Sequence, residues 1–93
     1  MPVRYTDRAA EELLNAVLWY ESVQQGLGAT MLQLVEDSLE RISQRPELYS
    51  LKHKHFRCCP ISRFPYSVFY TLESEEIVIH AIFDNRQNPI KRP

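Results

Sequence analysis

Residues 61–86, ISRFPYSVFYTLESEEIVIHAIFDNR, contain the pattern that decides the fold of this chain. Two runs rich in β-branched and aromatic residues, 66–72 and 76–83, flank the polar residues 73–75, which is typical of antiparallel strands joined by a short turn. The second run is apolar on both faces except at His80, and this predicts a strand covered on both sides. The sequence therefore predicts a β-hairpin at the centre of a sheet.

Helical periodicity dominates the first half of the chain. A helix capped by Thr6 or Asp7 is expected to run until the Gly-Leu-Gly at residues 26–28 ends it. A second helix is expected from about Ala29 until Pro46 stops it, because proline cannot continue a helix. In so short a chain, the apolar stripes of this helical hairpin have only one face of the sheet to cover.

Shorter stretches complete the expected sheet. Residues 3–5 are expected to form a first strand and residues 55–61 a further strand with a proline near its end. Residues 49–52 are a candidate for an additional short edge strand beside these main elements. The polar residues 84–93 are expected to be an irregular tail. The predicted fold is α+β, a two-layer single domain over residues 1–93 in the order β-α-α-β-β-β, with a mainly antiparallel sheet.

Charge is distributed unevenly along the 93 residues, whose net charge is only −1. Residues 1–45 carry four basic and seven acidic side chains, whereas residues 46–93 carry seven basic and five acidic ones and all three histidines. A basic sheet half is typical of a protein that meets an acidic partner or a polyanion, and a solvated surface explains the pattern equally well. The charged amino terminus and the absence of a long apolar run predict a cytoplasmic protein without a membrane segment.

The two cysteines and two of the histidines lie close together in the sequence. Cys58 and Cys59 are adjacent, so on a strand they point to opposite faces and are expected to stay reduced. His53 and His55 share one face of a strand, but no second pair of ligands accompanies them. We therefore expect no metal and no other cofactor.

Several basic side chains are candidates for chemistry on a phosphate. Cleavage of RNA through the 2′-hydroxyl needs a proton acceptor, a donor for the leaving oxygen and cations around the phosphate. The candidate catalytic residues are His80, Arg63 and Arg86, and the candidates for binding a target or a phosphate are Lys52, Lys54 and Arg57. The alternative is that His80 is a packed strand histidine and that the arginines hold loops together.

The first helix has more apolar residues than one buried stripe needs. Leu14, Leu18 and Trp19 lie outside that stripe. An apolar surface of this kind on a small monomer usually marks an interface, so these three residues are the candidate partner-binding surface.

The order of short motifs resembles the RelE/ParE toxin superfamily, and in particular its ParE-like plasmid-stabilisation branch. The motifs are WYE at 19–21, GLG at 26–28, PELY at 46–49, RFPYSVFY at 63–70, IVIHAIF at 77–83 and NRQNP at 85–89. The resemblance covers essentially the whole chain and implies that the first strand lies beside the last. It also implies a toxin of a type II toxin–antitoxin system that forms a hetero-oligomer with a cognate antitoxin protein.

Members of this superfamily act in different ways, and two departures of the sequence bear on the choice. Ser67 follows Tyr66 where the nuclease pattern has an arginine, and residues 84–93 contain no tyrosine or histidine. The resemblance therefore favours a ParE-like protein that inhibits growth by binding DNA gyrase. The alternatives are a metal-independent, ribosome-dependent mRNA endoribonuclease of RelE type and a non-toxic binding or regulatory module on the same fold.

Overall fold

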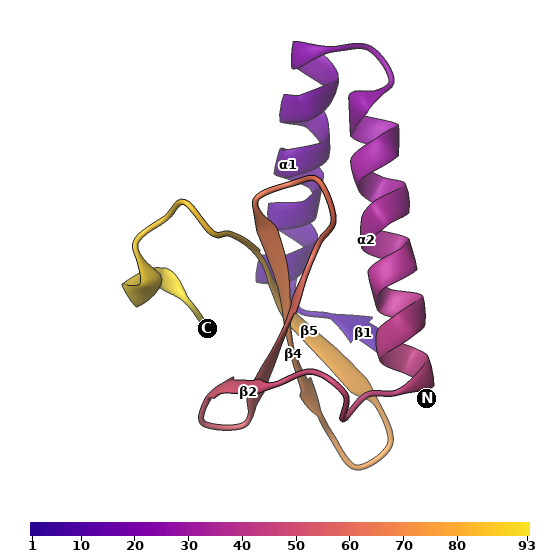
Figure 1. Cartoon of the computed structure of the whole chain (residues 1–93), viewed down its shortest axis with the longest axis vertical. Helices are drawn as coiled ribbons and strands as arrows, with labels where there is room; N and C mark the ends of the chain where they lie inside the picture. The colour runs from indigo at the N-terminus through magenta and orange to yellow at the C-terminus, as the bar shows by residue number, and fades with distance from the viewer.

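A computed structural model describes all residues 1–93 and shows two helices packed on a five-stranded mixed sheet (Figure 1). The elements in chain order are β1 (Val3–Tyr5), α1 (Asp7–Val23), α2 (Leu27–Gln44), β2 (Leu51–His53), β3 (Phe56–Pro60), β4 (Tyr66–Leu72), β5 (Ile77–Asp84) and the 3₁₀ helix η1 (Pro89–Lys91). The predicted α+β class and element order are confirmed.

The sheet has the strand order β1-β5-β4-β3-β2. β1 pairs with β5 in parallel, whereas the other neighbouring strands are antiparallel. The first strand therefore lies beside the last, as the resemblance implied. Because β1 pairs only with the first half of β5, the rest of that strand edge is left for other groups to satisfy.

The β4–β5 hairpin forms as predicted, with β4 at the expected bounds and β5 one residue later. Its register contains one irregularity: Phe69 pairs with Ala81, but Tyr70 pairs with Ile79. His80 is therefore an extra residue, and a bulge of this kind turns a side chain relative to the strand. The sequence pattern did not predict the bulge.

The turn between the helices differs from the prediction. α1 ends at Val23, and Leu27 and Gly28 already belong to α2, so that only Gly26 of the Gly-Leu-Gly lies in the turn, with φ +90°. The reason is the carboxylate of Glu21, which accepts hydrogen bonds from the backbone N–H groups of Gly26 and Gly28. These two donors lie at the start of α2, where a helix has no backbone acceptors of its own.

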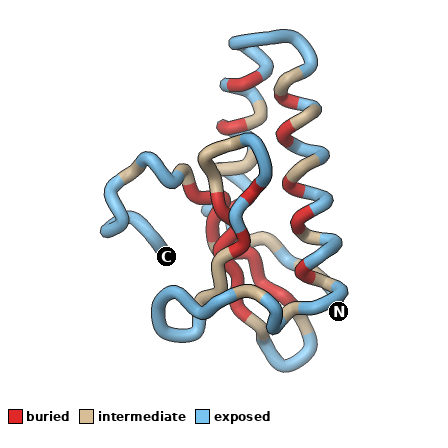
Figure 2. The backbone as a smooth tube through the Cα atoms, viewed as in Figure 1, coloured by how far each residue is buried: buried red, intermediate tan, exposed pale blue.

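Two apolar clusters lie on opposite faces of the sheet. Figure 2 shows the buried residues concentrated in the central strands and recurring along both helices. The larger cluster fills the space between sheet and helices and includes Tyr70, Ile79 and Met31. The smaller one, on the face without helices, consists of Phe69, Ala81 and Phe83, with Phe56 and Cys58 packed against them. Hence β5 is covered on both sides, as its sequence predicts.

The edge strand and the tail also differ from what the sequence predicts. β2 begins at Leu51 rather than at residue 49, and β3 is one residue shorter at each end than expected. The tail is not wholly irregular, because the Asn88 side chain accepts from the Ile90 N–H and starts η1. The tail returns toward the face of the sheet without helices (Figure 1), where the Arg92 guanidinium carbon lies 5.8 Å from the centroid of the Phe69 ring.

Candidate functional site

Arg63 and Arg86 flank the β4–β5 hairpin at the same end of the sheet. The register pairs Tyr66 with Asp84, so the loop that contains Arg63 and the turn that contains Arg86 leave the hairpin together. Both side chains belong to exposed residues. Arg63 also has φ +69°, a left-handed conformation that is uncommon for a residue other than glycine. Strained backbone of this kind is more frequent at functional sites than elsewhere.

The Arg86 guanidinium is held by a single carboxylate. Its Nε donates to Asp84 Oδ1 at 2.9 Å, and its Nη2 donates to Oδ2 at 2.8 Å. The backbone N–H of Arg86 also donates to Asp84 Oδ1. These bonds lower the pKa of the Asp84 carboxyl and raise the pKa of Arg86, so both groups stay charged at neutral pH. The adjacent Tyr66 hydroxyl has a raised pKa, chiefly because it is partly buried.

His80 lies in a different neighbourhood from the two arginines. It is about four residues along β5 from Asp84, or roughly 13 Å at strand spacing. Its Nε2 lies 2.8 Å from Thr71 Oγ1, and that hydroxyl donates to Glu73 Oε2 at 2.7 Å. Because the hydroxyl has only one proton to donate, His80 Nε2 is the donor toward it. The Phe56 ring packs edge-on against His80, with 5.0 Å between the centroids.

His80 is expected to make the folded protein less stable in mild acid. Burial lowers the pKa of His80 below its usual value of about 6.5, and nearby His55 and Arg4 act in the same direction, whereas Glu73 opposes them. The unfolded chain then binds a proton more readily, so the free energy of unfolding falls as the pH falls through the window below 6.5. Urea unfolding at pH 7.5 and 5.0 should show a larger loss for the wild type than for His80→Gln. Equal losses would mean that His80 does not titrate in this window.

The three candidate phosphate-binding residues have unequal surroundings. Arg57 Nη1 donates to the backbone carbonyls of Tyr49 and Glu47 at 2.7 and 3.2 Å, so this arginine holds the loop before β2. Lys52 and Lys54 are exposed and in no ion pair. Lys54 is the second non-glycine residue with a positive φ, +52°.

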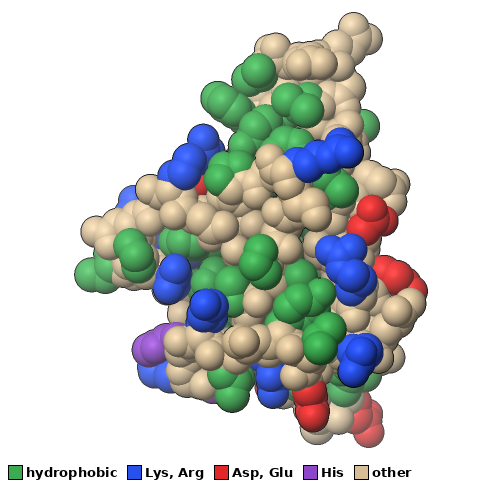
Figure 3. Space-filling model, viewed as in Figure 1, with side chains coloured by type: hydrophobic (Ala, Val, Ile, Leu, Met, Phe, Trp, Pro, Cys, Tyr) green, Lys and Arg blue, Asp and Glu red, His purple; other side chains and the backbone are tan.

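A basic groove lies between β2 and the tail. It has a volume of about 340 Å³ and is lined by Lys52, His53, Pro89, Ile90, Arg92 and Pro93. Figure 3 shows lysine, arginine and histidine side chains on this side of the molecule, and further lysine and arginine side chains across the rest of the same view. The sequence predicted a basic sheet half, but it did not predict that the tail supplies one wall of the groove.

Leu14, Leu18 and Trp19 are all more than half exposed, at 56, 59 and 56%. Leu14 and Leu18 are neighbours one turn apart on the same side of α1, whereas Trp19 lies about 100° further round the helix from Leu18. Leu14 lines an apolar groove of about 450 Å³ between α1 and α2, together with Leu32. Trp19 lines a second, more polar groove beside Tyr66. Figure 3 shows hydrophobic side chains on the surface of the helical hairpin.

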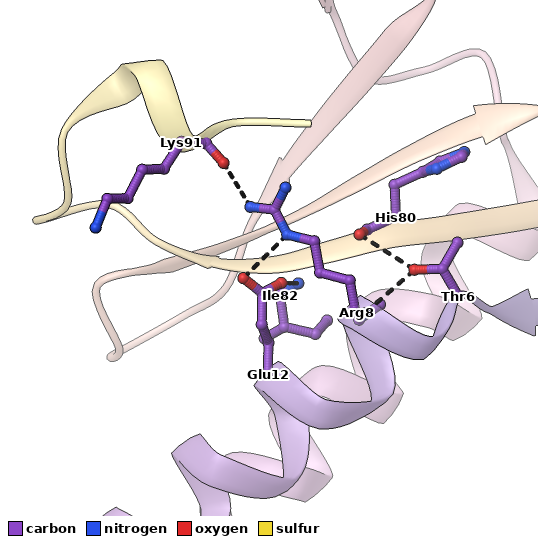
Figure 4. A network of polar contacts seen from close by, with 7 residues as sticks. Thr6, Arg8, Glu12, His80, Ile82 and Lys91 are labelled. Atoms are coloured by element: carbon purple, nitrogen blue, oxygen red, sulfur yellow. Dashed lines mark hydrogen bonds and ion pairs between the residues drawn. The ribbon is translucent and has the colours of Figure 1, made fainter.

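Sequence reasoning missed a polar network that joins α1 to β5 and to the tail (Figure 4). Thr6, which caps α1, also donates its hydroxyl to the carbonyl of His80. Glu12 Oε1 accepts from the Ile82 N–H at 3.1 Å, and Arg8 contacts both Glu12 and the carbonyl of Lys91. These side chains satisfy the strand edge that β1 leaves open. The contacts of the network with β5 and the tail join residues 70 or more positions apart, for which the sequence carries no signal.

Cys58 and Cys59 point to opposite faces of the sheet, as predicted, and both are free thiols. Burial raises the pKa of the Cys59 thiol. No group of three or more His, Cys, Asp or Glu side chains is arranged to hold a metal ion. Neither helix combines the length and apolar character that crossing a membrane would require.

Comparison with known proteins gives one family and one fold. The family model described as the ParE toxin of the type II toxin–antitoxin system, parDE, matches residues 3–89. A solved structure entitled "Chromosomal ParDE TA system from P. aeruginosa" is similar with a TM-score of 0.74 at 20% sequence identity, over 90% of this chain and 95% of that one. The comparison with curated proteins gave no match.

Proposed function

Because this chain belongs to the ParE toxin family of type II toxin–antitoxin systems, we propose that it arrests growth by binding DNA gyrase and that a cognate antitoxin neutralises it. Within that proposal, Arg86 and Arg63 contact the target at the end of the β4–β5 hairpin. Lys52 and Lys54 add positive charge on the sheet half. Charges of this kind steer association and select partners.

The separation of His80 from the two arginines is the observation that carries the choice of binding over cleavage. A ribonuclease needs its proton acceptor and its cations around one phosphodiester. Here the Nε2 of His80 is engaged by Thr71, and Arg86 is paired with Asp84 at the far end of the strand. This arrangement supports a protein that recognises its target rather than one that cuts RNA.

The basic groove between β2 and the tail supports the second candidate, a RelE-type mRNA endoribonuclease. Lys52, His53 and Arg92 meet there without an acidic side chain in the lining. Phosphate groups are bound by such cations. The third candidate is a non-toxic regulatory module, and it is compatible with the fold without calling on any particular site residue.

The mechanisms are separated by assays on the purified chain and in cells that express it. We expect it to inhibit supercoiling of a relaxed plasmid by DNA gyrase and to leave relaxation of the same plasmid by topoisomerase I unchanged. Mapping of transcript ends in cells that express the chain should show intact mRNA. Cuts within translated codons together with normal supercoiling would overturn the gyrase proposal in favour of the nuclease. Normal growth at a detectable protein level, in a host with a sensitive gyrase, would favour the non-toxic module.

The antitoxin is proposed to cover Leu14, Leu18 and Trp19. Since Leu14 and Trp19 line different grooves, a partner that covers both must pass around the exposed side of α1, where Leu18 lies. An extended or helical segment is able to do this, and it removes apolar surface from water on binding. The result is a hetero-oligomer of toxin and antitoxin.

Leu14→Asp is expected to weaken capture of the antitoxin encoded beside this gene by about tenfold or more, because a carboxylate in the lining of an apolar groove loses its hydration when a partner covers it. Co-expression with a tag on the toxin and quantification of the co-purified antitoxin measures the effect. Gln25→Asp, which adds the same charge at an exposed position in the turn between the helices, is the matched control. Equal recovery with both variants would remove Leu14 from the interface.

A further inference from the structure

The Asp84 carboxylate uses only one side of the Arg86 guanidinium. Of the five N–H donors of an arginine side chain, two bond to Asp84, those at Nε and Nη2. The remaining three, two on Nη1 and one on Nη2, lie at the end of the side chain. The end of a guanidinium is itself a fork that matches a pair of oxygens on a carboxylate or a phosphate.

The Tyr66 hydroxyl lies beside the Arg86 guanidinium, which opposes the rise that burial causes in the pKa of Tyr66. The surroundings otherwise leave the outer fork accessible. The Arg86 side chain is 58% exposed, although its partner Asp84 is only 22% exposed. Asp84 is fixed in turn by its place at the end of β5, opposite Tyr66. The carboxylate therefore has a rigid base, and the arginine that it holds faces solvent.

We propose that Asp84 is a positioning residue that locks Arg86 so that its terminal fork is presented to a paired-oxygen anion, a carboxylate or phosphate, on the target. This proposal rests on the proposed function, in which Arg86 contacts the target. An unrestrained arginine loses much rotamer freedom on binding, and Asp84 imposes that loss before the target arrives. Asp84 thus raises affinity through Arg86 without contacting the target.

Asp84→Asn separates this role from a merely structural one. Asparagine keeps an oxygen that accepts from the backbone N–H of Arg86 and is equally suited to this turn, but it loses the charge and the second acceptor. We expect the variant to need about tenfold more protein for the same growth arrest, with a melting temperature within about 2 °C of the wild type. Glu75→Gln, which removes one charge from the exposed turn at the other end of the hairpin, should change neither.

Two further measurements decide whether Asp84 acts through Arg86. In an Arg86→Lys background, where the side chain has no fork to hold, Asp84→Asn should reduce arrest by less than about threefold. In ¹⁵N NMR spectra the Arg86 Nε–H should exchange slowly with water and lose this protection in Asp84→Asn. A tenfold loss in the lysine background, greater activity of Asp84→Asn, or a fast-exchanging Nε–H in the wild type would each overturn the proposal.

Failure of the gyrase assignment is distinguishable from failure of this inference. If the wild type arrests growth but leaves supercoiling intact, the target is wrong, and the growth titration still measures the contribution of Asp84. If the wild type arrests no growth, both the proposed toxin function and the role of Asp84 in target binding are rejected, whatever the NMR result.

Discussion

Replacement of Arg86 by alanine is expected to abolish growth arrest while the protein remains folded. Truncation of one partner of a charged contact that is buried on binding typically costs about 2–5 kcal/mol, so the activity should fall by about thirtyfold or more. The free energy of unfolding of the Arg86→Ala protein should be close to that of the wild type. The Asp84 pair is largely exposed on the arginine side, and exposed ion pairs contribute little to stability because solvent screens them.

Arg4→Ala is the matched control for this experiment. Arg4 is also paired with one carboxylate, Glu76, and its side chain is 57% exposed, against 58% for Arg86. It lies on β1 at the opposite end of the β4–β5 hairpin. Growth titration should separate the two variants, whereas their thermal melts should coincide within a few degrees. Full arrest by a folded Arg86→Ala protein would remove Arg86 from the target-binding site and with it the role assigned to Asp84.

The parts of the fold that the sequence predicts are those that depend on local patterns. The β4–β5 hairpin was predictable because both strands are rich in β-branched and aromatic residues and the turn between them is polar. The cap of α1 was predictable because Thr6 immediately precedes the apolar periodicity. Each of these signals lies within a few residues of the structure that it specifies.

The parts that escaped prediction depend on side chains meeting across the fold. Nothing near Glu12 in the sequence indicates that it accepts a hydrogen bond from the N–H of Ile82. Gly-Leu-Gly reads as a terminator, yet Glu21 turns the backbone N–H groups of Gly26 and Gly28 into the capped start of α2. At the candidate site, the residue types were predictable. The orientation of His80 was not, because the bulge there changes the register of β5 against β4.

Gly28→Ala tests the closest approach between the two helices. A Cβ atom at this position would lie 2.6 Å from the backbone carbonyl oxygen of Val17 and 3.0 Å from Glu21. The carbonyl belongs to the α1 backbone and cannot rotate away, so the helices must separate. In an exposed helix the same change would stabilise the chain by about 1 kcal/mol, because alanine has the higher helix propensity. The close contact is therefore expected to reverse the sign of the effect.

We expect Gly28→Ala to lower the free energy of unfolding by about 2–3 kcal/mol, which corresponds to a melting temperature lower by about 10–20 °C in a chain of this size. Urea and thermal unfolding measure it, with Ala29→Gly at the next, exposed position as a control that should cost only about 1 kcal/mol. A more stable Gly28→Ala protein would show that the helices are not in contact at this point. Because separation of the helices also widens the groove that Leu14 and Leu32 line, capture of the antitoxin should weaken in this variant even at temperatures where it is fully folded.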